Sequence, residues 1–245
     1  MVIDEGQDIP ADILEHISIL VDMLDGHYYV FYDKNQYIMM HQSTHWLDTY
    51  GDCRLVLYKN CRNTADIART VGTTVDSIKK DVYINELAGI KPVGCFYDNI
   101  NELPSIVRNF VSRMMQDKLK YEDIVILTTT SVKNSMLHVD MDINSVPISI
   151  EPKKNHVLFT SVRKFKGLEA KAVLLIDVVV NKLDDELHKR LVYVGASRAN
   201  TYLQLAFYDS VHDEAYSRVI QALTGENNPN SGKNELLEVF GLDPL

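Results

Sequence analysis

The sequence has few cysteines and no long apolar segment. Its three cysteines, Cys53, Cys61 and Cys95, form no CxxC pair. They are too few and too scattered for a disulfide framework, and a zinc site built on sulfur is not expected without such a pair. No apolar run reaches the roughly 18 residues of a membrane span, and the N-terminus has no signal-peptide pattern. These absences favour a reduced protein of the cytoplasm.

An excess of positive charge is also missing. The chain of 245 residues has 25 Lys and Arg against 34 Asp and Glu, which gives a formal net charge of -9. Nonspecific electrostatic binding of nucleic acid is therefore not indicated, because proteins that bind nucleic acid in this way usually carry a basic domain or stripe. Cations are concentrated locally, with six cations and two anions between Glu151 and Lys171. A solvated surface is the alternative interpretation of this run.

The stretch from Val157 to Arg198 combines buried strands with a polar turn. Residues 157–159 and 172–180 are apolar runs of the kind found in strands of a parallel sheet that is buried on both faces. Between them, residues 163–169 contain cations, a glycine and a carboxylate. Ligands of open α/β sheets bind at the carboxyl ends of strands, so we expect this turn to face a nucleotide or a polynucleotide.

The remaining pattern predicts an α/β fold, with a parallel sheet flanked by crossover helices, because strands and helices alternate along the chain. After an initial strand that ends at Ile3, further strands are expected at residues 27–32, 54–60, 93–97 and 123–128, and a closing strand at 201–207. Helices are expected at about 10–24, 63–71, 102–118, 132–137 and 234–240, where Asn63 or Thr64 would cap the second of them.

Polar side chains follow the first two predicted strands. Asp4 and Glu5 come directly after the first strand, and Asp33 to Gln36 come after the second. Paired carboxylates at a strand end can hold Mg²⁺ beside a nucleotide phosphate and polarise an attacking water. For either strand end alone, a solvated turn without a binding role is the alternative interpretation. Two such strand ends in register favour a nucleotide site more strongly than one.

Three further residues are candidates for contacts with nucleic acid or phosphate. Tyr37 and Trp46 could stack on bases in a single-strand channel, with packing in the core as the alternative. Arg62 directly precedes a predicted helix and could reach a phosphate, with an ordinary surface charge as the alternative.

Five motifs in order resemble those of superfamily 1 DNA helicases of the UvrD/Rep/PcrA type, and helicases joined to nuclease-related domains are the nearest branch. Asp4 to Asp8 resembles the Walker B motif, and Asp33 to Gln36 resembles the motif that follows it. The segment from Leu57 to Thr64 is similar to the Leu-x-x-Asn-Tyr-Arg-Ser that opens the second RecA-like domain. Thr160 with Lys166-Gly167-Leu168-Glu169, and Leu191 to Ala199, match the last two motifs.

The resemblance implies an ATP-dependent enzyme with Mg²⁺ as cofactor and assigns a role to each motif residue. Asp4 would bind Mg²⁺, Glu5 would handle the attacking water, and Gln7 and Gln36 would sense the γ-phosphate. Arg62 and Arg198 would stabilise charge on that phosphate, while Glu169 would hold the ribose and Gly167 would allow close backbone approach. Single-stranded DNA would be contacted by Thr160, Arg163, Lys164 and Lys166, with Tyr37 and Trp46 as stacking candidates.

The sequence departs from this family in one important respect. It contains no G-x-x-x-x-G-K-[ST], the loop that cradles the β-phosphate. We therefore expect a C-terminal fragment that is inactive alone and needs the missing N-terminal RecA-like domain of the same polypeptide. Residues 1–50 would be the remnant of that first RecA-like (P-loop NTPase-type) domain, residues 51–210 the second RecA-like domain, and residues 211–245 an acidic C-terminal tail.

Two other functions remain open from the sequence. The parent protein could use ATP binding as a switch on an attached nuclease or defence module. Alternatively, the chain could be a degenerate RecA-like scaffold that binds protein partners, with the acidic tail as contact surface. Retention of Asp4, Glu5, Arg62, Glu169 and Arg198 counts against the scaffold.

Overall fold

A computed structural model describes most of the chain. The described residues are 1–33, 49, 53, 55, 59–60, 62–74, 83–84, 88–138, 143, 146–210, 214–226 and 231–245. The chain divides into two units, Met1–Leu57 and Tyr58–Leu245. This division lies near the boundary expected between residues 50 and 51.

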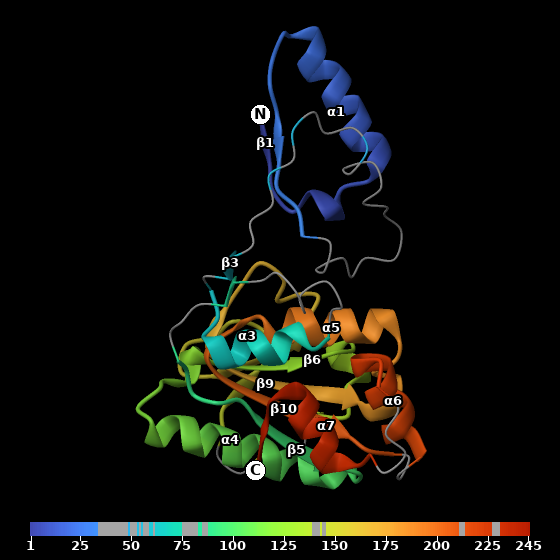
Figure 1. The fold of residues 1–245 in the computed structure, drawn as a ribbon. Helices are drawn as coiled ribbons and strands as arrows, with labels where there is room; N and C mark the ends of the chain where they lie inside the picture. The colour runs from blue at the N-terminus through green and yellow to red at the C-terminus, as the bar shows by residue number, and fades with distance from the viewer. Residues whose placement is uncertain are drawn as a thin grey trace. The chain divides into compact units, whose positions relative to one another are not determined.

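The first unit contains a short parallel sheet covered by one helix. Strand β1 (Val2–Ile3) pairs in parallel with β2 (Tyr29–Val30), and helix α1 (Ala11–Met23) connects them. Pro10 occupies the N-cap of α1, as the sequence predicted for the helix start. Ile3 and Leu14 are buried together between the strands and the helix. Figure 1 shows α1 alongside these strands.

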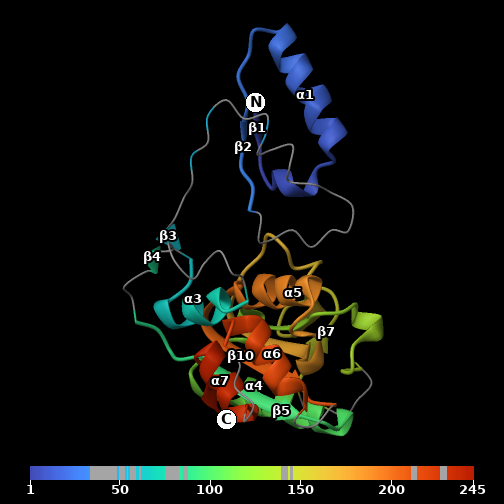
Figure 2. The ribbon, with the colours of Figure 1, turned by 45° about the vertical axis from the view of Figure 1, so that its right-hand side comes forward.

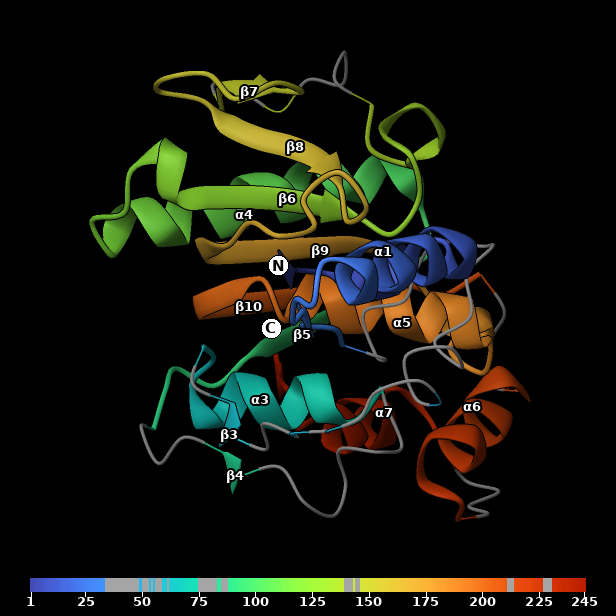
Figure 3. The same ribbon diagram turned by 90° about the horizontal axis from the view of Figure 1, so that it is seen from above.

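The second unit is built on a seven-stranded parallel sheet, which confirms the predicted α/β class. The strand order is β11, β5, β10, β9, β6, β8 and β7, and every neighbouring pair is parallel. Figure 3 looks onto this sheet, with β7 at one side and β5 toward the other. The strand bounds are Asp243–Pro244 (β11), Val93–Tyr97 (β5), Ala199–Tyr208 (β10), Ala170–Val179 (β9), Ile124–Thr128 (β6), Val157–Ser161 (β8) and Ile148–Ser149 (β7).

Helices cover both faces of this sheet, as the long apolar strands require. Helix α4 (Leu103–Gln116) lies on one face, and α3 (Ala65–Gly72) and α5 (Glu186–Ala196) lie on the other (Figure 1). Helix α3 also packs on α7 (Lys233–Phe240), which lies beside α6 (Glu214–Thr224), as Figure 2 shows. No helix in the described part of the chain is long and apolar enough to span a membrane.

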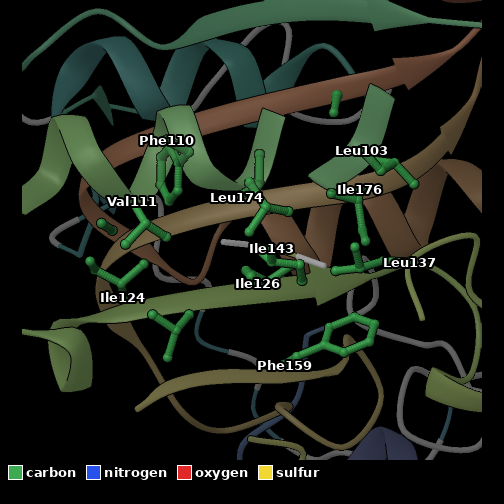
Figure 4. Close-up of a cluster of buried hydrophobic side chains, with 14 of the residues drawn as sticks. Leu103, Phe110, Val111, Ile124, Ile126, Leu137, Ile143, Phe159, Leu174 and Ile176 are labelled. Atoms are coloured by element: carbon green, nitrogen blue, oxygen red, sulfur yellow. The ribbon is translucent and has the colours of Figure 1, made fainter. Parts of the chain in front are cut away.

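The main core lies between α4 and the sheet. Apolar residues recur on one side of α4 at helical spacing, so a single face of the helix is buried. Leu103, Phe110 and Val111 from that face pack toward Leu174 and other strand residues, as Figure 4 shows. The cluster fixes α4 on the sheet and leaves the opposite face to α3 and α5.

Three elements differ from the sequence predictions. The expected closing strand is β10, which lies in the middle of the sheet between β5 and β9. The expected helix at 132–137 is a short 3₁₀ turn at Val132–Asn134. The segment expected to be irregular at 139–156 contributes β7 at the sheet edge. A second short parallel pair, β3 (Lys59–Asn60) with β4 (Tyr83–Ile84), lies outside the main sheet.

The C-terminal residues form part of the second unit instead of a separate acidic tail. Helices α6 and α7 pack on each other, and β11 extends the sheet beside β5. Leu236 and Phe240 on α7 are fully buried. The sequence predicted the helix at 234–240 but not that one of its faces is apolar and buried, and burial of that face makes residues 231–245 part of the second unit.

Candidate functional site

Arg62 and Glu169 form an ion pair on the surface of the second unit. Arg62 lies just before α3, and Glu169 lies just before β9. The Arg62 Nε is 3.5 Å from Glu169 Oε2, and both side chains are about half-exposed. The structure therefore brings together two residues that are 107 positions apart in the sequence and that both carry a predicted ATP role.

Arg198 lies within the same group of elements. It follows α5 and precedes β10, and its side chain is 1% exposed. Its guanidinium Nη1 donates to the Leu168 carbonyl at 3.5 Å, next to Glu169. We call Arg62, Glu169 and Arg198 the arginine cluster. In this structure Arg198 is turned into the protein, where its contact holds the turn before β9.

The arginine cluster lies at the amino ends of the strands, although the polar turn itself follows the carboxyl end of β8 as expected. The first residues of β9 and β10, Ala170 and Ala199, are paired, and the Ala170 N–H donates to the Arg198 carbonyl at 3.0 Å. Glu169 and Arg198 thus precede neighbouring parallel strands. The polar turn begins at the carboxyl end of β8, but its end must return to the start of β9 (Figure 3).

The polar turn is anchored by an apolar residue and exposes its cations. Phe165 is buried, whereas Arg163 and Lys164 are exposed and Lys166 is half-buried. Thr160 precedes the turn on β8, where it pairs with Leu127 and is 5% exposed. The turn thus offers cations to solvent while Thr160 is enclosed by the sheet.

Gly167 in the same turn has a φ of +83°, in the region that favours glycine. No protein atom lies within 4 Å of the Cβ that a larger residue would add there. Glycine is therefore favoured here by its backbone conformation, because a larger side chain would not collide with other parts of this chain.

A buried network at the carboxyl ends was missed by the sequence reasoning. Asp177 has a φ of +60° at a register shift in β9 and is 3% exposed. Its carboxylate accepts hydrogen bonds from the Thr128, Ser135 and Tyr97 hydroxyls and from the Met136 N–H. Burial, together with the negative charge of Asp177, raises the pKa of Tyr97. A lone aspartate inside an apolar run was the signal that could have indicated this network.

His188 is a second buried titratable group near this end of the sheet. It lies on α5 and is 8% exposed, and its Nε2 accepts the Val179 N–H at 3.1 Å. Burial, and to a lesser extent the nearby charge of Lys182, lowers the pKa of His188 to about 4. The ring is therefore neutral at physiological pH and ties α5 to the end of β9.

The first unit brings its predicted residues to one end of a parallel pair. Gln7 is buried, and its side chain donates to Glu5 and accepts the Asp33 N–H at 3.1 Å. Asp4 is exposed, and its carboxylate accepts the Glu5 N–H at 2.9 Å. Glu5 has a left-handed φ of 53°, which a non-glycine residue rarely adopts. Gln7 thus links the polar residues that follow β1 and β2, and the expected register of the two strand ends is confirmed.

No cluster of three or more His, Cys, Asp or Glu suited to a metal ion occurs among the described residues. Mg²⁺ commonly keeps several waters and takes one or two carboxylates together with substrate phosphates. The exposed Asp4 carboxylate fits that pattern as a single protein ligand. Three other predicted site residues, Gln36, Tyr37 and Trp46, lie outside the described residues.

The comparison with protein families falls on the segment that contains the polar turn. Residues 156–206 match the UvrD-like helicase C-terminal domain. The segment thus includes Glu169 and Arg198, together with Thr160, Arg163, Lys164, Lys166 and Gly167. It excludes Arg62 and the first unit. The match supports the resemblance to UvrD-type helicases over this C-terminal part of the chain and indicates a helicase-related role.

A solved structure is also similar. It is the C-terminal domain of a possible DNA helicase from Lactobacillus plantarum WCFS1, with 18% sequence identity and a TM-score of 0.49. The similarity covers 66% of this chain and 95% of that one. None of the curated proteins matches this chain.

Proposed function

We propose that this chain supplies the second RecA-like domain of an ATP-dependent DNA helicase or translocase. The observation that carries the proposal is the arginine cluster, in which Arg62 pairs with Glu169 and Arg198 bonds to the adjoining Leu168 carbonyl. Two of its three members lie within the UvrD-like match. Guanidinium groups suit the charge that develops on a transferring phosphoryl group, and a carboxylate can accept hydrogen bonds from ribose hydroxyls.

The proposal assigns residues of both units to ATP hydrolysis. Asp4 would hold Mg²⁺, which neutralises charge on the phosphate oxygens, and Glu5 would orient the attacking water. The contacts of Gln7 with Glu5 and with the Asp33 backbone suit a residue that senses the phosphate, together with Gln36. Arg198 must leave the Leu168 carbonyl to reach a phosphate, so activity requires its side chain to reorient.

Hydrolysis by the full-length protein tests this assignment. Arg198→Ala should lower the DNA-stimulated ATPase rate at least a hundredfold, because an arginine that stabilises this transition state is worth about 10³ to 10⁵ in rate. Arg69→Ala is the matched control, since Arg69 lies on α3 in an exposed pair with Asp66. This 245-residue chain alone should show no appreciable ATPase. Unchanged turnover in Arg198→Ala would reject the assignment.

The exposed cations of the polar turn are the proposed contact to single-stranded DNA. Arg163 and Lys164 project into solvent, and the neighbouring Lys166 adds charge. Each phosphate contact should contribute about 0.7 to the slope of log affinity against log salt. Arg163→Ala with Lys164→Ala should therefore weaken binding of a fluorescent oligonucleotide and reduce this slope by about 1.4. Lys91→Ala, which removes a cation paired with Asp243, should leave the slope unchanged.

The first unit has an apolar face that suggests its partner. Val2, Tyr29 and Phe31 are exposed, while α1 covers Ile3 and Val30 on the opposite side of the strands. Parallel sheets are normally covered on both faces, so a second layer is needed. We assign this layer to the N-terminal RecA-like domain of the same polypeptide. In a chain that contains that domain, amide hydrogen exchange at residues 29–31 should slow, and equal exchange in both chains would contradict the assignment.

A protein-binding scaffold is the second candidate, and one observation favours it. Arg198 has a structural contact of its own, so its retention does not require a role in hydrolysis. The scaffold predicts that Arg198→Ala destabilises the second unit and that the full-length protein hydrolyses no ATP. A switch on an attached nuclease or defence module would instead keep ATP hydrolysis without strand displacement.

A further inference from the structure

Asn63 connects the two arginines of the cluster through its side-chain amide. It directly follows Arg62, lies before α3 and is 3% exposed. Its Nδ2 donates to the Ser197 carbonyl at 3.1 Å and to the Ala199 carbonyl at 2.8 Å. These two carbonyls lie on either side of Arg198. The Asn63 side-chain amide therefore holds the backbone on either side of Arg198. The Asn63 backbone itself directly follows Arg62.

The sequence pattern suggested a different role for this residue. Asn63 or Thr64 was expected to cap α3, but Thr64 occupies the N-cap position and no side chain makes the capping bond. Asn63 instead reaches the junction of α5 and β10, which lies beside α3 (Figure 1). The helicase motif has serine at this position. A serine hydroxyl has one donor on a shorter side chain and cannot form both bonds.

We propose that Asn63 is a positioning residue that holds the backbone on either side of Arg198 in place for phosphoryl transfer. The inference rests on the proposed function, since it assigns Asn63 to the same site. Both carbonyls are at the amino end of the sheet, where β10 begins and α5 ends. Loss of the amide leaves that backbone free to shift. A displacement of about 1 Å in a catalytic group can cost about a hundredfold in rate.

Chemical modification of Arg198 tests the geometric part in this 245-residue chain. Phenylglyoxal reacts with accessible guanidinium groups, and mass spectrometry measures the extent of reaction at each arginine. Because Arg198 is 1% exposed, its reaction should be slow in the wild type. Asn63→Ala should raise the rate at least fivefold. Thr73→Ala is the matched control, because Thr73 Oγ1 donates from α3 to the Val239 carbonyl at 3.0 Å, away from Arg198.

The result is interpretable only in folded protein, which circular dichroism checks. If Asn63→Ala does not fold, Asn63→Ser provides the milder variant, with an increase expected between the wild type and Ala. An unchanged Arg198 rate in a folded Asn63 variant overturns the proposal. An equal increase in Thr73→Ala also overturns it, because general loosening of α3 would then explain the effect.

Kinetics of the full-length protein separate positioning from stability. Asn63→Ala should lower kcat for DNA-stimulated ATP hydrolysis about tenfold to a hundredfold and leave the KM for ATP within about twofold. In an Arg198→Ala background, Asn63→Ala should have no further effect, because it acts through that arginine. Independent, additive losses overturn the positioning role. If the wild type hydrolyses no ATP, the proposed function fails and so does the catalytic role of Asn63, while the modification rates still decide the backbone contact.

Discussion

Protonation of His188 should reduce the stability of the second unit as the pH falls from 8 to 5. The imidazole Nε2 accepts a hydrogen bond from the Val179 N–H in a buried site. Protonation of Nε2 would turn this acceptor into a donor that faces the Val179 N–H, and the hydrogen bond would be lost. The ordinary pKa of 6.5 is lowered to about 4 in the folded protein. Between these two values the unfolded chain binds a proton that the folded chain does not, so stability falls as the pH falls.

The size of this effect follows from the two pKa values. The full loss between pH 8 and pH 3 is about 3 kcal/mol, since each pKa unit is worth about 1.4 kcal/mol. At pH 5 the loss is already about 2 kcal/mol, and the contribution of His188 to the free energy of unfolding should be constant above pH 8. The carboxylate of Asp123 does not interfere between pH 8 and pH 5. Hydrogen bonds from the Lys120 backbone and the Lys171 side chain lower its pKa, so it titrates at more acidic pH.

Urea denaturation followed by far-ultraviolet circular dichroism measures this dependence. The wild-type midpoint should fall by about 1 M between pH 8 and pH 5. His188→Gln should be less stable at pH 8 by about 1 kcal/mol, because the Val179 N–H loses its imidazole acceptor, but its midpoint should change little with pH. His156→Gln, a histidine outside this contact, serves as the control and should keep the wild-type dependence. The same midpoint shift in His188→Gln and in the wild type would refute the reasoning.

Four substitutions test other parts of the structure, three by the same denaturation assay and one by proteolysis. Gly195→Ala should destabilise the second unit by about 1 to 3 kcal/mol, because its Cβ would lie 2.7 Å from Leu175 Cδ1 and 2.9 Å from Val162 Cγ2; an unchanged midpoint would show that α5 has room to shift. Gly6→Ala should lower the protease resistance of the first unit, because its Cβ would lie 2.3 Å from Val30 Cγ1, and Val30→Ala in the same chain should partly restore it. Asp177→Ala should cost about 3 kcal/mol and more than Asp177→Asn, since Ala leaves several buried donors without an acceptor; equal costs would contradict this account. Glu169→Gln should change stability by less than about 0.5 kcal/mol, because its pair with Arg62 is half-exposed, and a larger loss would mean that the pair is structural.

Several strands of the sheet were predictable from their local content of apolar and aromatic residues. The segment at 93–97 has the same bounds as β5, and β8 begins at Val157 as expected. Burial of these runs depends on their own composition, so the local pattern was sufficient. Helix α6 was missed because its apolar face lies within a segment that was interpreted from its acidic charge. The place of β10 in the middle of the sheet could not be predicted, because strand order depends on pairing with distant segments.

The candidate site was predictable in its residues but not in its position. Motif resemblance identified Arg62, Glu169 and Arg198 separately, and the structure brings all three together. Their location at the amino ends of the strands depends on the pairing of β9 with β10 and on the path of the turn after β8. Neither is encoded by local periodicity. The contact of Asn63 with two distant carbonyls could not be predicted from the sequence for the same reason.

The two ends of the sheet differ in what their charged residues do for the fold. At the carboxyl ends, Asp177 is buried and accepts several hydrogen bonds, so its loss would leave donors without partners. At the amino ends, Arg62 and Glu169 form a pair that water can reach, and such pairs contribute little to stability. The fold therefore requires Asp177 but gains little from the pair of Arg62 with Glu169. Charged residues that stability does not require, held next to a buried arginine, are the ones available for a ligand, and this is why we place the candidate site at the amino ends.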